Sequence, residues 1–502
     1  MKRQRSCHER LRASVLGSGL TCLLLVASGC GGAHGAAANG AASPAPAADE
    51  AWREQRPPAG TARLFDYPSA QVSRLPNGVQ LYLVPRKAGT VALSISAHAG
   101  GSACGPGKSG LAALSLRLMT EATRKKDALS LAEAAESLGA SLDFDTGRDG
   151  SSVSLEVLPS DVDAGLALLS EVITEPRFSL DDVTRVKKLW LDSLVSERQE
   201  PSRLSSLAGM RALLGTTIGA PVRGSLADVE RLTREDLRRF HKEHYVASNL
   251  AVIAVGDLTM ERLTELSQSS LGGLPQSSPP RPLPLELPPP PAHTVVWLVD
   301  RPGSVQSAVF IGQPFPERSA PGHEARQVMN NLLGGLFTSR LNLNLREKHA
   351  YTYGVRSTAI ATLRWGAFIG MSSIKTENTA DALDQLRAEL GGLKAGSPNP
   401  ITTEELDRSK TDLIQGLGAN LEHVRRILGD TAELFIDGLP PDYQHNYATL
   451  IAKVDQESAA AEARRLDPDH SVIVIVGDRQ KIEPLLEGKG LSLKLAPEQL
   501  VE

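Results

Sequence analysis

The feature that most constrains the fold is a repeat that divides the sequence into two similar halves. The segment NLAVIAVGD begins at Asn249, and the similar segment HSVIVIVGD begins at His470. A second pair of similar segments is DDVTRVKK at Asp181 and EELDRSKT at Glu404. Because the two separate pairs give nearly the same offset, about 220 residues, we expect the chain to fold as two copies of one structural unit.

Each half alternates between patterns typical of strands and patterns typical of helices. Residues 91–99 and 153–158 alternate with a period of two, as half-buried strands do. Between them, residues 109–123 and 129–140 carry apolar side chains at helical spacing, and Gly139 ends the second stretch. The sequence therefore predicts an α+β fold of two homologous half-domains, each a mainly antiparallel sheet covered by helices on one side.

A proline-rich segment separates the two halves. The 502 residues exceed what one hydrophobic core usually organises, and residues 277–293 divide the folded part almost equally. Repeated proline forbids helix and central strand and favours an extended, semi-rigid spacer. We expect an N-terminal domain at residues 63–276, a linker at residues 277–293, and a C-terminal domain at residues 294–502.

The N-terminus has the order of a bacterial lipoprotein signal. Five basic residues precede an apolar run from Val15 to Ala27, which is too short and wrongly flanked for a permanent membrane span. The run ends in Ala-Ser-Gly-Cys, so residues 1–30 are predicted to be a signal peptide with Cys30 as the lipid attachment point. Two alternatives are an ordinary cleaved signal in which Cys30 is incidental, and a single-pass anchor.

The segment after this signal predicts a tether. Residues 31–62 are mostly Ala, Gly and Pro and cannot bury a core, so we expect a flexible spacer. Gly31 stands where an Asp often retains lipoproteins in the inner membrane. We therefore expect a lipid-anchored, periplasm-facing protein of the cell envelope, with the outer membrane favoured.

Composition excludes some classes of function. A formal net charge of −4 and an aromatic share of 4% provide neither a basic stripe nor stacking platforms for nucleic acid. Of the four cysteines, only Cys104 lies beyond the predicted signal, so the mature chain cannot form an intrachain disulfide. Cys104 has no His nearby in the sequence, so we expect an incidental thiol and not a nucleophile.

The N-terminal half resembles the insulinase/pitrilysin zinc metallopeptidases, which include mitochondrial processing peptidase. The resemblance lies in the order strand, glycine-rich loop, helix beginning GLA, helix ending LGA, and strand. In catalytic members the first helix carries His-x-x-Glu-His, whose imidazoles bind zinc and whose Glu activates the metal-bound water. Here that helix reads GLAALSLRL, which puts Ala113, Leu116 and Arg117 at the three positions. None of them can bind zinc, so the resemblance implies a member that holds no metal itself.

The family's third zinc ligand is also missing. It is a Glu roughly 70 to 80 residues after the second His. Val186 and Ser193 stand where the family usually shows Glu. Asp192 and Glu197 are the nearest carboxylates, and without the imidazoles neither is expected to hold a metal.

Two other motifs invite a functional interpretation that we do not favour. His241 and His244 are three residues apart and could hold a metal, but we expect them to be surface histidines. The segment GPGKSG at residues 105–110 hints at a phosphate-binding loop, but the pattern needs a Gly where Ser102 stands. The sequence therefore does not predict ATP binding.

Residues 334–357, GGLFTSRLNLNLREKHAYTYGVRS, resemble the best-preserved C-terminal block of the same family. In many members an Arg and a Tyr seven residues later hold the substrate backbone and stabilise the oxyanion at a zinc across a chamber. Arg346 and Tyr353 match that pair, while Tyr351 is a possible substitute and His349 is expected to be a bystander. The plain alternatives are a solvated helix-end cation for Arg346 and an ordinary strand aromatic for Tyr353.

The resemblance spans residues 63–490 and implies two half-domains arranged as a clamshell. Bacterial members often work as two chains, one bearing zinc and one bearing the Arg/Tyr pair. We therefore expect the non-catalytic, substrate-positioning subunit of a heterodimeric zinc metallopeptidase that degrades or processes peptides. Zinc is expected in a partner subunit that carries His-x-x-Glu-His.

Two other functions remain open. One is a structural or peptide-binding envelope lipoprotein without any proteolytic role. The other is autonomous peptidase activity, which would require zinc in the purified chain.

Overall fold

The computed structural model describes residues 65–501 except residues 394–395, 488 and 490. The predicted signal peptide, the lipid attachment at Cys30 and nearly all of the predicted tether lie outside the described residues. No described helix is both long enough and apolar enough to cross a membrane.

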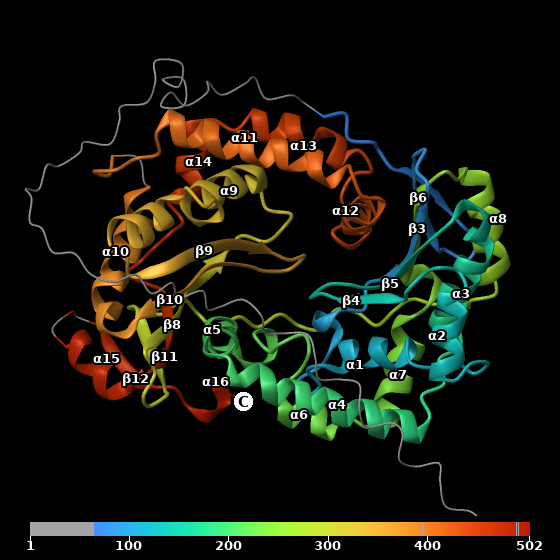
Figure 1. The fold of residues 1–502 in the computed structure, drawn as a ribbon, viewed down its shortest axis with the longest axis horizontal. Helices are drawn as coiled ribbons and strands as arrows, with labels where there is room; N and C mark the ends of the chain where they lie inside the picture. Colours follow the sequence, from blue (N-terminus) through green and yellow to red (C-terminus); the bar gives the residue numbers. More distant parts are fainter. Residues whose placement is uncertain (1–64, 394–395, 488, 490, 502) are drawn as a thin grey trace, which may run out of the picture. The chain divides into compact units, whose positions relative to one another are not determined.

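The described residues form two six-stranded sheets, one in each half of the chain (Figure 1). The first sheet has the order β1-β2-β6-β3-β5-β4, and the second has the order β12-β7-β11-β8-β10-β9. The strands of the first sheet are β1 (Gln71–Arg74), β2 (Gln80–Pro85), β3 (Val91–Ala97), β4 (Asp143–Thr146), β5 (Ser151–Val157) and β6 (Leu250–Gly256). Those of the second sheet are β7 (Val295–Asp300), β8 (Gln306–Phe315), β9 (Thr352–Ala361), β10 (Gly366–Lys375), β11 (Val472–Gly477) and β12 (Ser492–Leu495).

The two repeated Gly-Asp segments form equivalent strands of the two sheets. β6 lies between β2 and β3, and β11 lies between β7 and β8. Most neighbouring strands are antiparallel, but β6 runs parallel to β2, and β7 runs parallel to both β11 and β12. The predicted α+β class and the pair of homologous half-domains are confirmed, and the parallel pairs are an addition to the prediction.

The second repeated segment forms an equivalent helix in each half. In the first half it lies in α4 (Leu180–Gln199), and in the second half it lies in α11 (Thr403–Asn420). Ser179 caps α4 and Thr402, at the equivalent place of the repeat, caps α11, each through a side-chain oxygen that accepts a backbone N–H. Acidic residues follow in the first turn of each helix, where they complement the helix dipole.

Each sheet is covered on one face by helices of its own half. In the first half, α3 (Val162–Thr174) packs on β3 and β5, and α8 (Met260–Leu271) packs on β1 and β2. The remaining helices of this half are α1 (Leu111–Met119), α2 (Ala128–Glu136), α5 (Pro201–Ile218), α6 (Leu226–Arg231) and α7 (Arg234–His244). Those of the second half, besides α11, are α9 (His323–Asn330), α10 (Thr379–Gly392), α12 (Val424–Ile436), α13 (Tyr443–Ala452), α14 (Gln456–Ala463), α15 (Arg479–Leu486) and α16 (Glu498–Val501).

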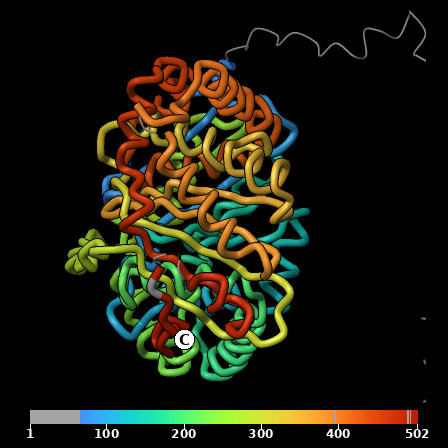
Figure 2. Tube along the Cα trace, turned by 90° about the vertical axis from the view of Figure 1, so that its left-hand side faces the viewer, coloured from blue at the N-terminus to red at the C-terminus, as the bar shows by residue number. Residues whose placement is uncertain are grey.

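The other face of each sheet is covered by a helix from the opposite half. α12 of the second half packs on β3 and β6, and α5 of the first half packs on β8 and β11 (Figure 1). The first residues of α5 and α12, Pro201 and Val424, are separated by the same offset as Asp181 and Glu404, so the halves exchange equivalent helices. The expectation of helices on one side only was therefore wrong. Figure 2 shows the C-terminal segment reaching α5, in agreement with the contact between α16 and α5.

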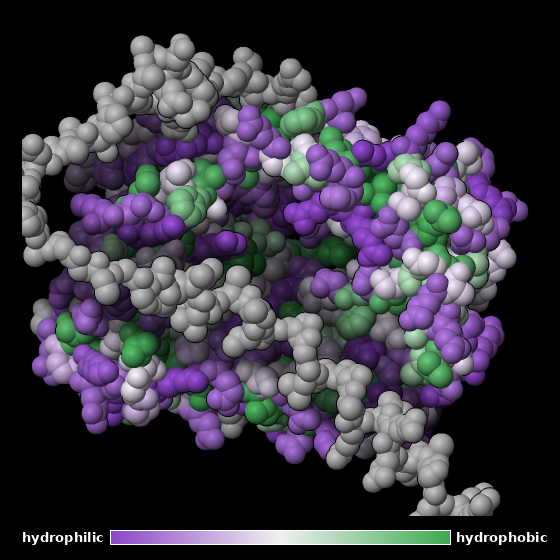
Figure 3. Space-filling model, in the orientation of Figure 1, coloured by the Kyte–Doolittle hydropathy of each residue, from purple (hydrophilic) through white to green (hydrophobic). Residues whose placement is uncertain are grey.

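This exchange explains why the central strands are apolar along their whole length. Every residue of β3, β6 and β11 is buried, because one face meets helices of the same half and the other face meets the exchanged helix. Between the halves, residues 275–294 form no helix or strand and connect α8 to β7. The face seen in Figure 3 is mainly hydrophilic, with apolar residues scattered over it.

A glycine allows α5 to lie close to the second sheet. A Cβ atom at Gly209 would lie 2.2 Å from the ring of Phe310, which is fully buried on β8. The equivalent residue of α12, at the same offset as the helix starts, is the small Ala432, which is buried in the core shared by both halves. Small residues at these positions let each exchanged helix approach the sheet that it covers.

Gly209→Ala is expected to lower the free energy of unfolding by about 1–3 kcal/mol, because the new methyl group overpacks against Phe310. Gly429→Ala is the matched control, since Gly429 lies on an exposed side of α12 and no atom beyond its chain neighbours and the nearby backbone of α12 lies within 4 Å of the place that its Cβ would take. The control is expected to raise the free energy of unfolding by about 0.5–1 kcal/mol through helix propensity. Urea denaturation followed by circular dichroism measures both, and equal stabilisation by the two changes would contradict the close contact.

Candidate functional site

The three residues that the sequence resemblance places at the family's zinc positions lie on α1, and none of them presents a metal ligand. Ala113 and Leu116 are buried in the first half, and neither carries a donor atom. The guanidinium of Arg117 donates to the Glu121 carboxylate across one helical turn, with 2.6 Å between Nη2 and Oε2. It also lies over the ring of Phe144 on β4, 5.7 Å from the ring centroid. These residues do not fit a zinc ion.

An ion-pair network joins α1 to α4 at this place. The Glu121 side chain is only 8% exposed, and its carboxylate accepts from Arg117 and from Arg185 of α4. Arg185 also lies 3.6 Å from Asp182, measured from Nη2 to Oδ1. The two helices that carry the metal ligands in catalytic members of the resembled family are thus held together here by two cations around one carboxylate.

The expected third-ligand region of α4 offers no alternative metal site. Val186 is buried in the core, and the hydroxyl of Ser193 donates to the Trp190 carbonyl oxygen at 2.7 Å. Glu197 accepts from Arg223 at 2.6 Å, and Asp192 is exposed. Over the part of the chain that the structure describes, no three His, Cys, Asp or Glu residues form a group that could hold a metal ion.

Glu121→Gln is expected to lower the free energy of unfolding by about 1–3 kcal/mol, because two guanidinium groups lose their shared counter-charge. Glu136→Gln, on an exposed position of α2, removes the same charge and should change stability by less than about 0.5 kcal/mol. Chemical denaturation of the two variants measures the difference. A loss at Glu121 no larger than at Glu136 would show that the network does not hold the helices together.

The two histidines of α7 are structural, but they are not on the surface as expected. His244 is buried and packs against Phe240, with 4.4 Å between ring centroids. His241 is half-buried, stacks on Tyr245 at 5.4 Å, and lies 2.7 Å from the Ile173 carbonyl oxygen through Nε2. Burial lowers the pKa of both imidazoles, so both are neutral at neutral pH. The prediction of surface histidines was wrong because α7 turns this face toward the core.

The loop at residues 105–110 and the nearby cysteine also have structural partners. Lys108 pairs with Asp236 at 2.8 Å, and the Ser109 hydroxyl donates to Asp228 at 2.6 Å, so the loop is tied to α7 and α6. Burial raises the pKa of the Cys104 thiol to about 11, which keeps it protonated at neutral pH. These contacts give the Lys and the Cys packing roles in the first half.

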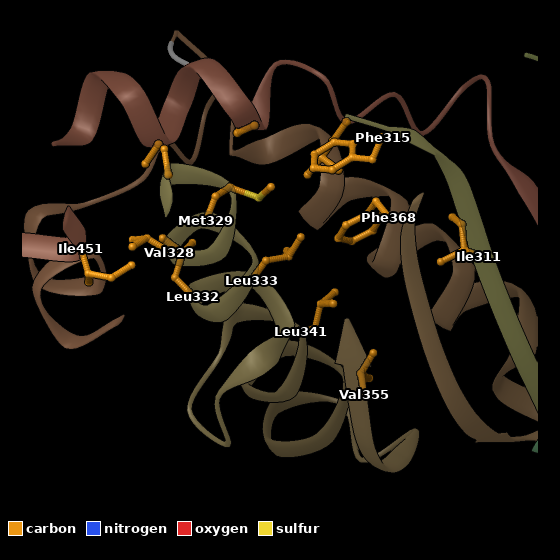
Figure 4. Packing of buried hydrophobic residues seen from close by; sticks show 14 of the residues in the cluster. Ile311, Phe315, Val328, Met329, Leu332, Leu333, Leu341, Val355, Phe368 and Ile451 are labelled. Atoms are coloured by element: carbon orange, nitrogen blue, oxygen red, sulfur yellow. The ribbon is translucent and has the colours of Figure 1, made fainter. Parts of the chain in front are cut away.

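In the second half, Arg346 lies in an irregular helix that packs on β9. Residues Asn342–Lys348 form a π-helix, η6, which follows another π-helix, η5 (Asn331–Gly335). Figure 4 shows Leu333 and Leu341 packed in one apolar cluster with Val355 of β9. This cluster fixes η6 against the strand that carries Tyr353. π-helical turns are rare and frequently occur at functional sites.

Tyr353 lies at a second irregularity, at the start of β9. Val355 pairs with Ser372 and Thr352 pairs with Ile374, so β9 has one residue more than β10 across this interval. Such a bulge turns a side chain away from the regular alternation of the strand. Tyr353 is accordingly 89% exposed. Between the two irregular segments, Ala350 has a φ of 53°, a left-handed conformation that is unfavourable for a residue with a Cβ atom.

These irregular segments bring Arg346 and Tyr353 to one pocket of about 390 Å³. The guanidinium of Arg346 stacks on the ring of Phe337, 4.1 Å from the centroid, and its Nε lies 3.3 Å from Glu347. Stacking holds the guanidinium flat and leaves N–H groups free for a ligand. The other lining residues include Gly334, Gly335, Asn342, Gly354, Arg356 and Met371.

Of Tyr353, Tyr351 and His349, which lie close together in the sequence, only Tyr353 lines the pocket. Tyr351 packs against the apolar core and stacks on His349, with 4.9 Å between ring centroids. Neither Tyr351 nor His349 lines the pocket that contains Arg346. Phe337 was not singled out from the sequence, although it lies within the block GGLFTSRL, because only the stacking geometry shows its relation to Arg346.

Comparisons with known proteins identify the family. The description "Insulinase (Peptidase family M16)" matches residues 83–221, and "Peptidase M16 inactive domain" matches residues 231–413. A crystal structure titled as a peptidase M16 inactive domain from Pseudomonas fluorescens is 26% identical, with a TM-score of 0.75. It covers 82% of this chain, and 98% of its own length is matched. The chain belongs to the insulinase (M16) peptidase family.

The relatives of this M16 homologue carry two kinds of name. An "Uncharacterized zinc protease" of Mycobacterium leprae is 26% identical over 61% of this chain and 68% of its own length. The "Non-peptidase homolog YmxG" of Helicobacter pylori is 23% identical over 72% of this chain and 83% of its own length. A solved protease structure from Helicobacter pylori, 19% identical with a TM-score of 0.75, shares the fold over 82% of this chain and 100% of its own length.

The side chains of α1 indicate whether this chain is closer to the relatives named zinc proteases or to the relative named a non-peptidase homolog. The sequence resemblance places Ala113, Leu116 and Arg117 at the positions of His-x-x-Glu-His, and Arg117 forms an ion pair with Glu121. A chain with these residues lacks the zinc ligands and the general base that catalysis in the family requires. This chain is therefore an inactive M16 homologue, like the relative that is named a non-peptidase.

Proposed function

We propose that this chain is the substrate-positioning subunit of a heterodimeric zinc metallopeptidase. The proposal rests on one observation. Arg346 and Tyr353 line the same pocket, and α1 of the same chain carries no zinc ligand. A partner subunit with His-x-x-Glu-His would supply the zinc and the activated water. This subunit would supply donors for the peptide that lies between the two chains.

Arg346 and Tyr353 have the chemistry that this role requires. The guanidinium offers N–H donors in a fixed plane, and the Tyr hydroxyl offers one further donor. Donors that are already in place stabilise the negative charge that develops on a peptide carbonyl oxygen without reorganising during the reaction. The contact of Arg346 with Phe337 holds the first of these donors, and the bulge in β9 brings Tyr353 to the same pocket.

Exposed apolar side chains around the Arg346 pocket support the proposal that a peptide or a partner subunit covers this surface. Phe337 is 66% exposed, Leu343 is 45% exposed, and Tyr353 is 89% exposed. Aromatic residues and Arg are enriched at the energetically important centres of interfaces. A patch of this composition is better explained by a surface that a peptide or a partner subunit covers than by a surface that always faces water.

The proposal includes the place of the protein in the cell. The lipoprotein signal predicted for residues 1–30 supports a lipid anchor at Cys30 and a periplasm-facing position, with the outer membrane favoured. The tether predicted for residues 31–62 would hold the folded part clear of the lipid headgroups.

A second candidate function is a structural or peptide-binding role without proteolysis. The similarity to a relative named a non-peptidase homolog favours this non-proteolytic role as the second candidate. In that case Arg346 and Tyr353 would bind a peptide that is never cleaved.

The decisive assay mixes the purified chain with a candidate partner, an M16 chain that carries His-x-x-Glu-His. Cleavage of an unstructured fluorogenic peptide should require both chains. Arg346→Ala should lower kcat by about 100-fold or more, because one pre-placed donor to the developing oxyanion is lost. Arg464→Ala, which removes an exposed cation at the end of α14, is the matched control and should leave the rate unchanged.

The outcomes separate the two candidate functions. Undiminished cleavage with Arg346→Ala would remove the proposed role of this residue. If the two chains do not associate, or if they bind the peptide without cleaving it, the non-proteolytic role is supported instead.

A further inference from the structure

A second concave surface lies on the first half and shares no residue with the Arg346 pocket. It has a volume of about 850 Å³ and is formed by the segment after α1, the segment before α4, α7, and the segment after α8. We call it the basic pocket, because six of its lining residues are cations and only two, Glu235 and Glu243, are carboxylates. The cations are Arg124, Arg177, Arg234, Arg238, Arg239 and Lys242.

Three of these cations are engaged within the protein. Arg177 pairs with Asp182 at 2.7 Å, and Arg239 pairs with Asp236 at 2.9 Å. Arg234 donates through Nε to the carbonyl oxygen of Phe178 at 2.5 Å. These contacts fix the rim of the basic pocket.

The other three cations have no such partner. The side chains of Arg124, Arg238 and Lys242 are exposed and make no ion pair or hydrogen bond within the described part of the chain. Arg238 and Lys242 are one helical turn apart on α7, where two like charges destabilise a helix by roughly 0.2–0.5 kcal/mol. Cations that are gathered in a concavity and outnumber its carboxylates attract an anion, because the shape concentrates their field.

The rest of the lining is mostly apolar. Pro176, Phe178, Val246, Leu274 and Pro275 contribute apolar groups, and His241 and Tyr245 contribute rings that also carry polar atoms. Phe178 has a φ of 43°, which is unfavourable for an aromatic residue, and burial of its side chain holds it there. A site with cations and apolar groups side by side matches a ligand that is itself both anionic and apolar.

We propose that the basic pocket binds the phosphate group of an anionic phospholipid. Arg and Lys side chains make charge-assisted hydrogen bonds to phosphate oxygens, and Arg can make two at once. The attraction is local, since the chain as a whole has a formal net charge of −4. A free phosphate compound shares the phosphate chemistry but has no apolar part for Phe178 and Leu274 to contact.

The test uses the full chain with Cys30→Ser, which removes the predicted acylation. Isothermal titration calorimetry with monomeric dihexanoyl phosphatidic acid should show saturable binding that weakens as sodium chloride is added. Arg238→Gln/Lys242→Gln should weaken the affinity at least tenfold, and circular dichroism should show an unchanged fold because both side chains are exposed. Lys188→Gln/Arg203→Gln removes the same charge from exposed positions of α4 and α5 and should leave the affinity unchanged.

Two further ligands distinguish the source of the phosphate. Dihexanoyl phosphatidylcholine should bind at least tenfold more weakly than phosphatidic acid, because its own cation cancels the charge. Inorganic pyrophosphate that binds as tightly as phosphatidic acid would overturn the assignment to a lipid. Absence of phosphatidic acid binding, or equal losses in the pocket variant and the control variant, would overturn the site itself. The proposal does not depend on the peptidase assay.

Discussion

The exchange of α5 and α12 between the two halves is the interaction on which the rest of the structure depends. Ala208, Leu213 and Leu214 of α5 pack with Phe310 and Val474 of the second sheet. Residues of α12, among them Leu428 and Phe435, share a core with Tyr82, Ala92 and Ile253 of the first sheet. Separating the halves would expose both apolar faces, so the halves are fixed to each other.

Packing and ion pairs hold α1 at the place where the sequence resemblance puts the zinc site of catalytic M16 members. Ala113 and Leu116 contribute only packing to α1, and the Arg117–Glu121–Arg185 network joins α1 to α4. On the second sheet, apolar packing holds η6 against β9 and sets Arg346 beside Tyr353. Packing and ion pairs thus join α1 to α4 in the first half, and the irregular backbone of the second half lies where ligand contacts are proposed.

Much of this architecture could be predicted from the sequence, because it depends on short-range patterns and on repetition. The offset between Asp181 and Glu404 predicted equivalent elements, and the caps of α4 and α11 are separated by the same offset. The alternation in residues 153–158 appears as the alternating burial of β5. The seven-residue spacing of Arg346 and Tyr353 predicted their proximity only through resemblance, since neither the π-helix nor the bulge has a local sequence signal.

What could not be predicted depends on contacts between distant segments. The exchange of α5 and α12 needs the register of two sheets, which no local pattern specifies. The burial of His244 and the stacking of Phe337 on Arg346 follow from that packing. The basic pocket likewise joins Arg124, Arg177 and α7, which are far apart in the sequence.

We propose that this M16 chain holds no zinc and contributes instead to a site that another chain completes. Elemental analysis of zinc tests this in the purified chain alone and in a complex with an M16 chain that carries His-x-x-Glu-His. We expect no stoichiometric zinc in the chain alone and about one equivalent per complex, bound by the partner subunit. One equivalent of zinc in the chain alone, lost on treatment with a chelator, would contradict it.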